Sequence, residues 1–137
     1  MEMQKLYLAP TELDPEITLS HEEKIFRISG TSSPENVRAT YETAIEWMSN
    51  YRNMLKTGSS PFTDDEPFVF EIDLEYFNSS SAIFLYELVM IVKAIKENGV
   101  PAIIRWYFDP ADTDSREAGE DLAILAEMEF EYANKKG

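Results

Sequence analysis

A run of three serines, Ser79 to Ser81, is the feature of this sequence that most favours chemistry. It follows Asn78, at the junction between an alternating apolar segment and a long apolar one. One hydroxyl is expected to cap a helix by accepting a hydrogen bond from a free backbone N–H, although a cap needs only one of the serines. A phosphoryl group there would add about two negative charges, which the N–H groups of a helix start favour and Asp73 and Glu75 oppose. The run therefore predicts a helix cap, a phosphorylation switch, or both.

The single histidine, His21, lies in a polar turn at residues 20–24. A catalytic triad needs an imidazole that is oriented beside a nucleophile, and a turn seldom provides this, so we expect a solvated turn rather than a catalytic residue. Glu22 and Glu23 follow directly, but adjacent residues on a turn seldom converge on one metal ion. The five glycines are scattered along the chain, so no phosphate-binding loop is expected. These residues predict no catalytic, metal or cofactor site.

Carboxylates are dense near the end of the sequence, where Glu117, Glu120 and Asp121 fall on neighbouring turns of one predicted helix. A solvated helix face is the simplest interpretation, and a partner-docking surface is the alternative. A small metal-dependent hydrolase that uses residues 117–121 is a further hypothesis. The sequence shows no calcium-loop pattern, and the lack of cysteine excludes disulfides, zinc-thiolate sites and thiol nucleophiles.

The charge of the chain restricts its partners. There are 12 basic and 26 acidic residues, for a formal net charge of −14. Nucleic-acid binding is not expected, because such proteins neutralise phosphates with lysine and arginine, and an anionic membrane surface is disfavoured for the same reason. The start of the sequence lacks the pattern of a signal peptide, and its longest apolar stretch is too short to span a bilayer. We therefore expect a cytoplasmic protein without membrane insertion.

The first half of the sequence predicts a hairpin and a helix. Residues 17–19 and 25–28 alternate on either side of the turn and are expected to pair, with Gly30 ending the second strand. Ser33 and Pro34 suit a helix start, as cap and first helical residue. The apolar positions that then recur at helical spacing are Val37, Tyr41, Ala44, Ile45, Met48, Tyr51 and Leu55.

The second half alternates strands and helices. A strand is predicted over residues 68–77, with Phe68, Phe70, Ile72 and Leu74 on one face and its acidic residues on the other. A helix over 79–98, a central strand over 100–108, a helix over 112–128 and an edge strand over 129–133 follow. In the last helix, Ala118, Leu122 and Leu125 are expected to face inward. This order predicts a single α/β domain over residues 1–137, with a mixed sheet packed against about three helices.

Five ordered segments of the sequence resemble the SiaC family of regulatory phosphoproteins, which has a STAS-like fold similar to that of anti-sigma-factor antagonists. They are LYLAPTELDPEITL (6–19), ISGTSSPEN (28–36), LEYFNSSS (74–81), WYF (106–108) and EAGED (117–121). The resemblance implies a non-enzymatic partner-switching protein without a cofactor. It also implies a dedicated Ser/Thr protein kinase, a PP2C-like phosphatase, and an effector such as a diguanylate cyclase that the unphosphorylated form binds and activates in cyclic-di-GMP and biofilm signalling.

In this resemblance the phosphorylated position matches Ser79, with Ser80 and Ser81 as possible secondary hydroxyls. The sequence departs from the family pattern twice: serine replaces the usual threonine, and Ala82-Ile83 stands where a lysine often follows. These departures leave the effector's identity open. The contact face is expected to comprise Asn78, Glu75, Tyr76, Ala82 and Ile83, the helix that follows, and the loop at residues 61–66. A constitutive binding module without a switch is the remaining alternative.

Overall fold

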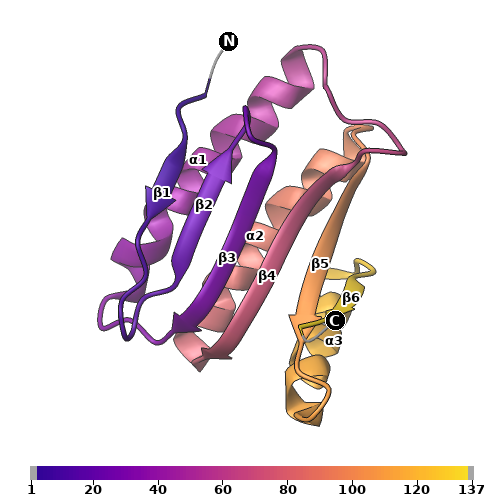
Figure 1. Ribbon diagram of the computed structural model, residues 1–137. Helices are drawn as coiled ribbons and strands as arrows, with labels where there is room; N and C mark the ends of the chain where they lie inside the picture. Colours follow the sequence, from indigo (N-terminus) through magenta and orange to yellow (C-terminus); the bar gives the residue numbers. More distant parts are fainter. Residues whose placement is uncertain (1–2, 136–137) are drawn as a thin grey trace.

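The computed structural model describes residues 3–135, which form one six-stranded sheet and three helices (Figure 1). The elements are β1 (Leu6–Leu8), β2 (Glu16–Ser20), β3 (Ile25–Ser32), α1 (Val37–Thr57), β4 (Phe68–Phe77), α2 (Ser79–Glu97), β5 (Ala102–Phe108), α3 (Thr113–Ala126) and β6 (Glu131–Asn134). The strands lie in chain order across the sheet, antiparallel from β1 to β3 and parallel from β3 to β6. The predicted α/β fold with a mixed sheet is confirmed.

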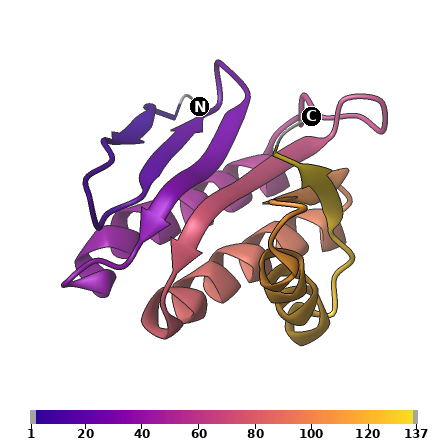
Figure 2. The same ribbon diagram turned by 60° about the horizontal axis from the view of Figure 1, so that its bottom comes forward.

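All three helices lie on the same face of the sheet (Figures 1 and 2). Each parallel connection steps to the next strand in the same direction, and because such connections are right-handed, each helix is placed on the same side. The side chains of β4 differ between the two faces of the sheet. Phe68, Phe70 and Ile72 are fully buried under the helices, whereas Glu71 and Asp73 point to the open face. The predicted division of this strand into an apolar and an acidic face is confirmed.

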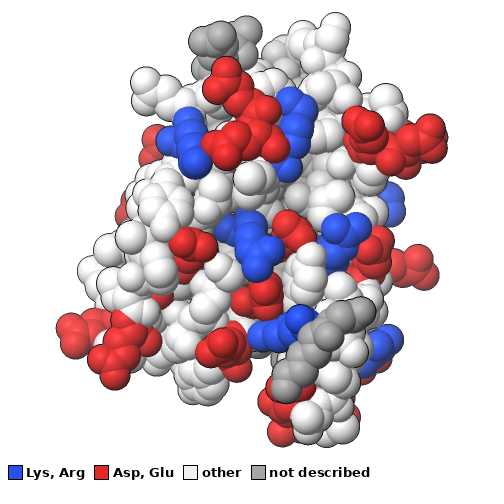
Figure 3. All heavy atoms as spheres, viewed as in Figure 1, with Lys and Arg blue, Asp and Glu red and all other residues white. Residues whose placement is uncertain are grey.

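Ion pairs cross the open face from strand to strand, and Figure 3 shows blue and red side chains alternating over the sheet. Arg27 of β3 lies 2.8 Å from the carboxylate of Asp73 on β4, and the Lys135 ammonium lies 3.3 Å from the same carboxylate. Arg105 of β5 pairs with Glu131 of β6 at 2.7 Å. Such partly exposed pairs add little stability individually, but they keep this uncovered face polar.

Helix α1 covers the antiparallel half of the sheet with a cluster of aromatic rings. The Phe26 ring lies 4.4 Å from that of Phe68 and 5.3 Å from that of Tyr51, measured between centroids. His21 belongs to this cluster, because its Nδ1 lies 2.6 Å from the Tyr51 hydroxyl. Partial burial lowers the pKa of His21 and burial raises that of Tyr51. The turn is at the surface, as predicted, but the His21 ring packs inward against Tyr51.

Two boundaries in the first half differ from the sequence prediction. β3 continues past Gly30 to Ser32, with the register shifting after Gly30, whose φ of 94° suits glycine. α1 begins at Val37 rather than at Pro34, and its cap is Asn36, whose side-chain oxygen accepts from the Ala39 amide. The Ser33 amide instead donates to the Leu13 carbonyl at 2.8 Å, which holds this segment extended beside the β1–β2 connection.

Helix α3 lies directly on the ring of Trp106 because Gly119 has no side chain. A Cβ built on Gly119 would lie 2.7 Å from the Trp106 ring atoms, well inside van der Waals contact. The Trp106 indole N–H also donates to the Ser115 carbonyl at 3.0 Å, which ties the first turn of α3 to β5. The glycine of the EAGED segment therefore sets the distance between helix and sheet.

Gly119→Ala should destabilise the fold. At an open helical position this substitution raises the free energy of unfolding by about 1 kcal/mol, but here the added methyl group must displace the Trp106 ring. We expect a loss of about 1–3 kcal/mol, typical of overpacking, measured by urea unfolding. Glu117→Ala, exposed on the same helix, is the control and should stay within about 0.5 kcal/mol of the parent. A gain in stability for Gly119→Ala would contradict this packing.

Candidate functional site

The serine run lies where β4 ends and α2 begins, beside the end of β3. Asn78 is the N-cap of α2: its side-chain oxygen accepts from the backbone N–H of Ser81 at 2.8 Å. The backbone N–H of Asn78 donates to the Ser32 carbonyl at 3.1 Å. The expectation that a serine caps this helix is wrong, since asparagine takes that place and Ser79 is the first helical residue. The sequence carried the signal, because asparagine is among the most favoured N-cap residues.

Ser81 is completely buried and belongs to a hydrogen-bonded cluster of three hydroxyls. The Ser81 Oγ lies 2.8 Å from the Ser32 Oγ and donates to the Ser32 carbonyl at 3.0 Å. The Ser32 Oγ lies in turn 2.6 Å from the Tyr41 hydroxyl of α1. Burial raises the pKa of Tyr41 to about 12, so the phenol stays protonated. This burial makes Ser81 a poor candidate for the secondary modifiable hydroxyl, since the folded chain does not expose it to a kinase.

Ser79 and Ser80 are exposed, and neither hydroxyl makes a hydrogen bond to any part of residues 3–135. Helical spacing separates them, because residues four apart share a face. Ser80 lies on the side of Phe84, which stacks on Tyr41 of α1 at 5.7 Å. Ser79 lies on the side of Ile83, which faces α3. The two accessible serines thus serve different surfaces of α2.

The charges around Ser79 differ from those expected. Asp73 lies on the open face of the sheet, where Arg27 and Lys135 neutralise it, so its predicted repulsion of a phosphate at the run is wrong. Glu75 is exposed near the end of the strand. On the α1 side, the Arg38 guanidinium lies 5.8 Å from the centre of the Phe84 ring.

An apolar groove lies between α2 and α3 on the Ser79 side of α2. This α2–α3 groove, of about 470 Å³, is lined by Phe77, Ala82, Ile83, Tyr86, Ala118, Asp121, Leu122 and Leu125. Leu122 is buried as predicted, but Leu125 is 69% exposed, so its predicted inward orientation is wrong. The helix turns only one row of apolar residues into the core, and Leu125 lies at the outer edge of that row.

The loop at residues 61–66 lies far from the serine run. It precedes β4, whereas Ser79 follows β4, and Figure 1 shows the two at opposite ends of the sheet. Ten residues of extended chain separate them, a distance of about 30 Å. Phe62 of this loop is instead buried against Phe26 and Phe68. Phe62 is the only buried residue of this loop, so its part in a partner contact stays a prediction, at a place remote from the serine run.

The carboxylates of α3 do not converge on one point. Glu120 lies 3.7 Å from Arg116 in an exposed pair, Asp121 lines the α2–α3 groove, and Glu117 is exposed. Within residues 3–135 no group of three or more potential metal ligands lies together. Nor does any helix in that range have the length and apolar character needed to cross a bilayer.

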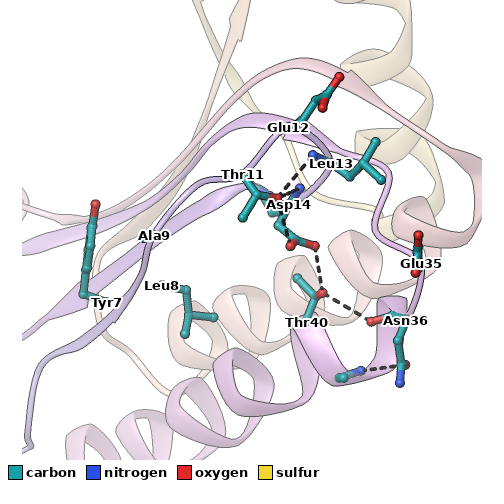
Figure 4. A pocket seen from close by; sticks show the side chains of 12 residues that line it. Tyr7, Leu8, Ala9, Thr11, Glu12, Leu13, Asp14, Glu35, Asn36 and Thr40 are labelled. Atoms are coloured by element: carbon teal, nitrogen blue, oxygen red, sulfur yellow. Dashed lines mark hydrogen bonds between the residues drawn. The ribbon is translucent and has the colours of Figure 1, made fainter.

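A second cavity, of about 690 Å³, lies between the β1–β2 connection and the first turns of α1 (Figure 4). Its polar groups bond mainly to one another: Asp14 accepts from the Thr11 hydroxyl at 3.0 Å and from that of Thr40 at 3.5 Å. Thr40 also donates to the Asn36 carbonyl at 3.2 Å. These bonds fix the connection against α1, which is a structural role.

Comparison with known proteins shows the family to which this chain belongs. The model of the SiaC family of regulatory phosphoproteins matches residues 8–135, nearly the whole chain. The chain belongs to the SiaC family. An uncharacterized protein of Pseudomonas aeruginosa strain UCBPP-PA14 is 24% identical over 122 residues, which is 88% of each chain.

Solved structures of SiaC itself have the same fold. Apo-SiaC from Pseudomonas aeruginosa superposes with a TM-score of 0.72 at 22% identity, covering 96% of this chain and 98% of that one. SiaC in the crystal structure of the diguanylate cyclase SiaD with its activator SiaC, from the same organism, gives a TM-score of 0.78 at 21% identity, covering 94% and 97%. The match to the family model therefore establishes membership of the SiaC family, and the similarity to these structures establishes the fold.

Ser81→Ala should destabilise this SiaC family member. The substitution removes one partner of the buried Ser32 hydroxyl and carbonyl, and unsatisfied buried polar groups cost about 1–3 kcal/mol. The loss is measured by urea unfolding. Ser80→Ala, which removes an exposed and unbonded hydroxyl, should change stability by less than about 0.5 kcal/mol. Equal stability of the two variants would contradict the structural role of Ser81.

Proposed function

We propose that this chain is a non-enzymatic regulatory phosphoprotein that changes partners when Ser79 is phosphorylated. The observation that carries the proposal is the division of the serine run: Ser81 is locked in the core, whereas Ser79 is exposed, unbonded and adjacent to an apolar groove. The family supports the regulatory and phosphoprotein character. A modification at Ser79 leaves the Asn78 cap and the Ser81 cluster intact, so the surface can change while the fold stays the same.

The effector in this proposal is a diguanylate cyclase, which the unphosphorylated chain binds and activates. Support comes from the relative SiaC, whose solved complex with SiaD is that of a diguanylate cyclase with its activator. A Ser/Thr protein kinase that accepts serine at position 79 adds the phosphate, and a PP2C-like phosphatase removes it. The proposal places the chain in the cytoplasm, because these enzymes act there on ATP and GTP, and links it to cyclic-di-GMP and biofilm control.

The proposed contact face surrounds Ser79. Asn78, Glu75 and Tyr76 lie on one side of it along the chain, and Ala82 and Ile83 lie one turn further into α2. An unmodified hydroxyl can be covered by a partner at little energetic cost. A phosphate there would lose its hydration beneath an apolar surface, which disrupts binding.

The phosphorylation site can be tested by incubating the chain with its kinase and mapping the product by phosphopeptide mass spectrometry. We expect modification at Ser79, its loss in Ser79→Ala, and its retention in Ser80→Ala, the neighbouring exposed serine. Modification confined to other residues would contradict the proposal.

The switch can be tested by measuring the affinity for the cyclase calorimetrically. Ser79→Asp should weaken binding by about 10- to 100-fold, the equivalent of about 1–3 kcal/mol for a charge left unpaired in an interface. Ser80→Asp, on the α1 side of the helix, should weaken it far less. A constitutive binding module would instead show one affinity before and after phosphatase treatment.

A further inference from the structure

We propose that the α2–α3 groove is the site where the effector docks, and that the effector presents to it a row of apolar side chains flanked by lysines or arginines. This inference rests on the proposed function and adds to it the place and the chemistry of the contact. Three features of the described chain carry it: the distribution of exposed apolar side chains, the unpaired charges at the groove, and the position of Ser79 along it.

Two of the most exposed apolar side chains of the described residues line this groove. Within residues 3–135, six large hydrophobic side chains are exposed: Tyr7, Leu13, Tyr76, Ile83, Ile124 and Leu125. Ile83 and Leu125, 62% and 69% exposed, face each other from α2 and α3 as walls of the groove. Contiguous apolar surface of this kind marks interaction sites in proteins. The open face of the sheet contrasts with it, because charged pairs cover that face (Figure 3).

The charges at the groove are acidic and lack internal partners. Asp121 lines it, and Glu87 and Glu117 are exposed one turn from Ile83 and Asp121 respectively. None of the three carboxylates belongs to an ion pair with another described residue, and no lysine or arginine in residues 3–135 lines the groove. Arg116 of α3 is directed elsewhere, over the rings of Phe108 and Tyr132 at 5.0 and 4.6 Å. In the proposed complex, the cations that complement these carboxylates come from the partner.

The position of Ser79 explains how one phosphate can block this surface. Ser79 lies one helical turn before Ile83, at one end of the groove, and Glu87 lies two turns beyond Ser79, about 12 Å along the helix. The apolar row of the partner covers the end near Ser79, and its cations meet the carboxylates further along. A phosphate on Ser79 is then buried against apolar atoms, out of reach of the cations, so its charge opposes binding.

Two adjacent residues of α3 allow a matched test. Leu125 lines the groove, whereas its neighbour Ile124 is equally exposed but lies outside it, against Met128 and Phe130. We expect Leu125→Lys to weaken binding of the diguanylate cyclase from the same genome at least tenfold by calorimetry, and Ile124→Lys to change it less than twofold. Equal effects of the two substitutions, or none from Leu125→Lys, would overturn the assignment of the groove.

The basic character of the partner is tested by charge reversal. Asp121→Lys should weaken cyclase binding and reduce its sensitivity to salt, whereas Glu42→Lys, exposed on α1, should leave both unchanged. Cross-linking of the complex should identify a cyclase segment with apolar residues flanked by lysine or arginine; an acidic segment, or tighter binding by Asp121→Lys, would overturn the proposed chemistry.

These outcomes are separate from a failure of the switch. If the unmodified chain binds no cyclase, or binds with the same affinity when Ser79 carries a phosphate, the proposed function is wrong. If Ser79 phosphorylation weakens binding while Leu125→Lys does not, the switch stands and the docking site lies elsewhere.

Discussion

The hydrogen bonds that join the end of β3 to the start of α2 determine most of what this surface can do. Asn78 binds the Ser32 carbonyl through its amide and caps α2 through its side chain, while Ser81 binds Ser32 from within the core. Together they fix the rotation of the helix about its axis. With Ser81 turned inward, Ser79 must face α3 and Ser80 must face α1. A shift of one residue would bury a different serine and expose another, so three chemically identical hydroxyls acquire three different environments.

The one-sided sheet makes the rest of the arrangement possible. Because every crossover places its helix on the same face, α2 and α3 lie side by side with a groove between them, while the opposite face of the sheet is left to solvent. That face satisfies its own charges through pairs such as Arg27–Asp73. The α2–α3 groove does not, since its apolar walls and the carboxylate of Asp121 have no internal partner among the described residues. Gly119 contributes by letting α3, which forms one wall of the groove, lie directly on the Trp106 ring.

Much of the fold follows from local sequence pattern, and much of the site does not. The alternation of Phe68, Phe70 and Ile72 and the order of the elements predict the sheet, because each depends on residues near in sequence. The burial of Ser81 depends on Ser32, 49 residues away, and on Tyr41 of another helix, so no local sequence pattern predicts it. Leu125 has the spacing of a core residue, but α3 is packed on one narrow side and leaves this residue outside. The capping role of Asn78, in contrast, can be predicted from local sequence, although the adjacent serines are equally suitable N-cap residues.

The central claim is that one phosphate on Ser79 switches an effector off while the fold stays unchanged. Its most direct test is the rate of cyclic-di-GMP synthesis by the cyclase, measured against the fraction of the chain phosphorylated at Ser79. The account predicts that the rate falls in proportion to that fraction and reaches the rate of the cyclase alone at full modification, with the circular dichroism of the chain unaltered. A rate that stays at the activated level when Ser79 is fully phosphorylated would contradict it.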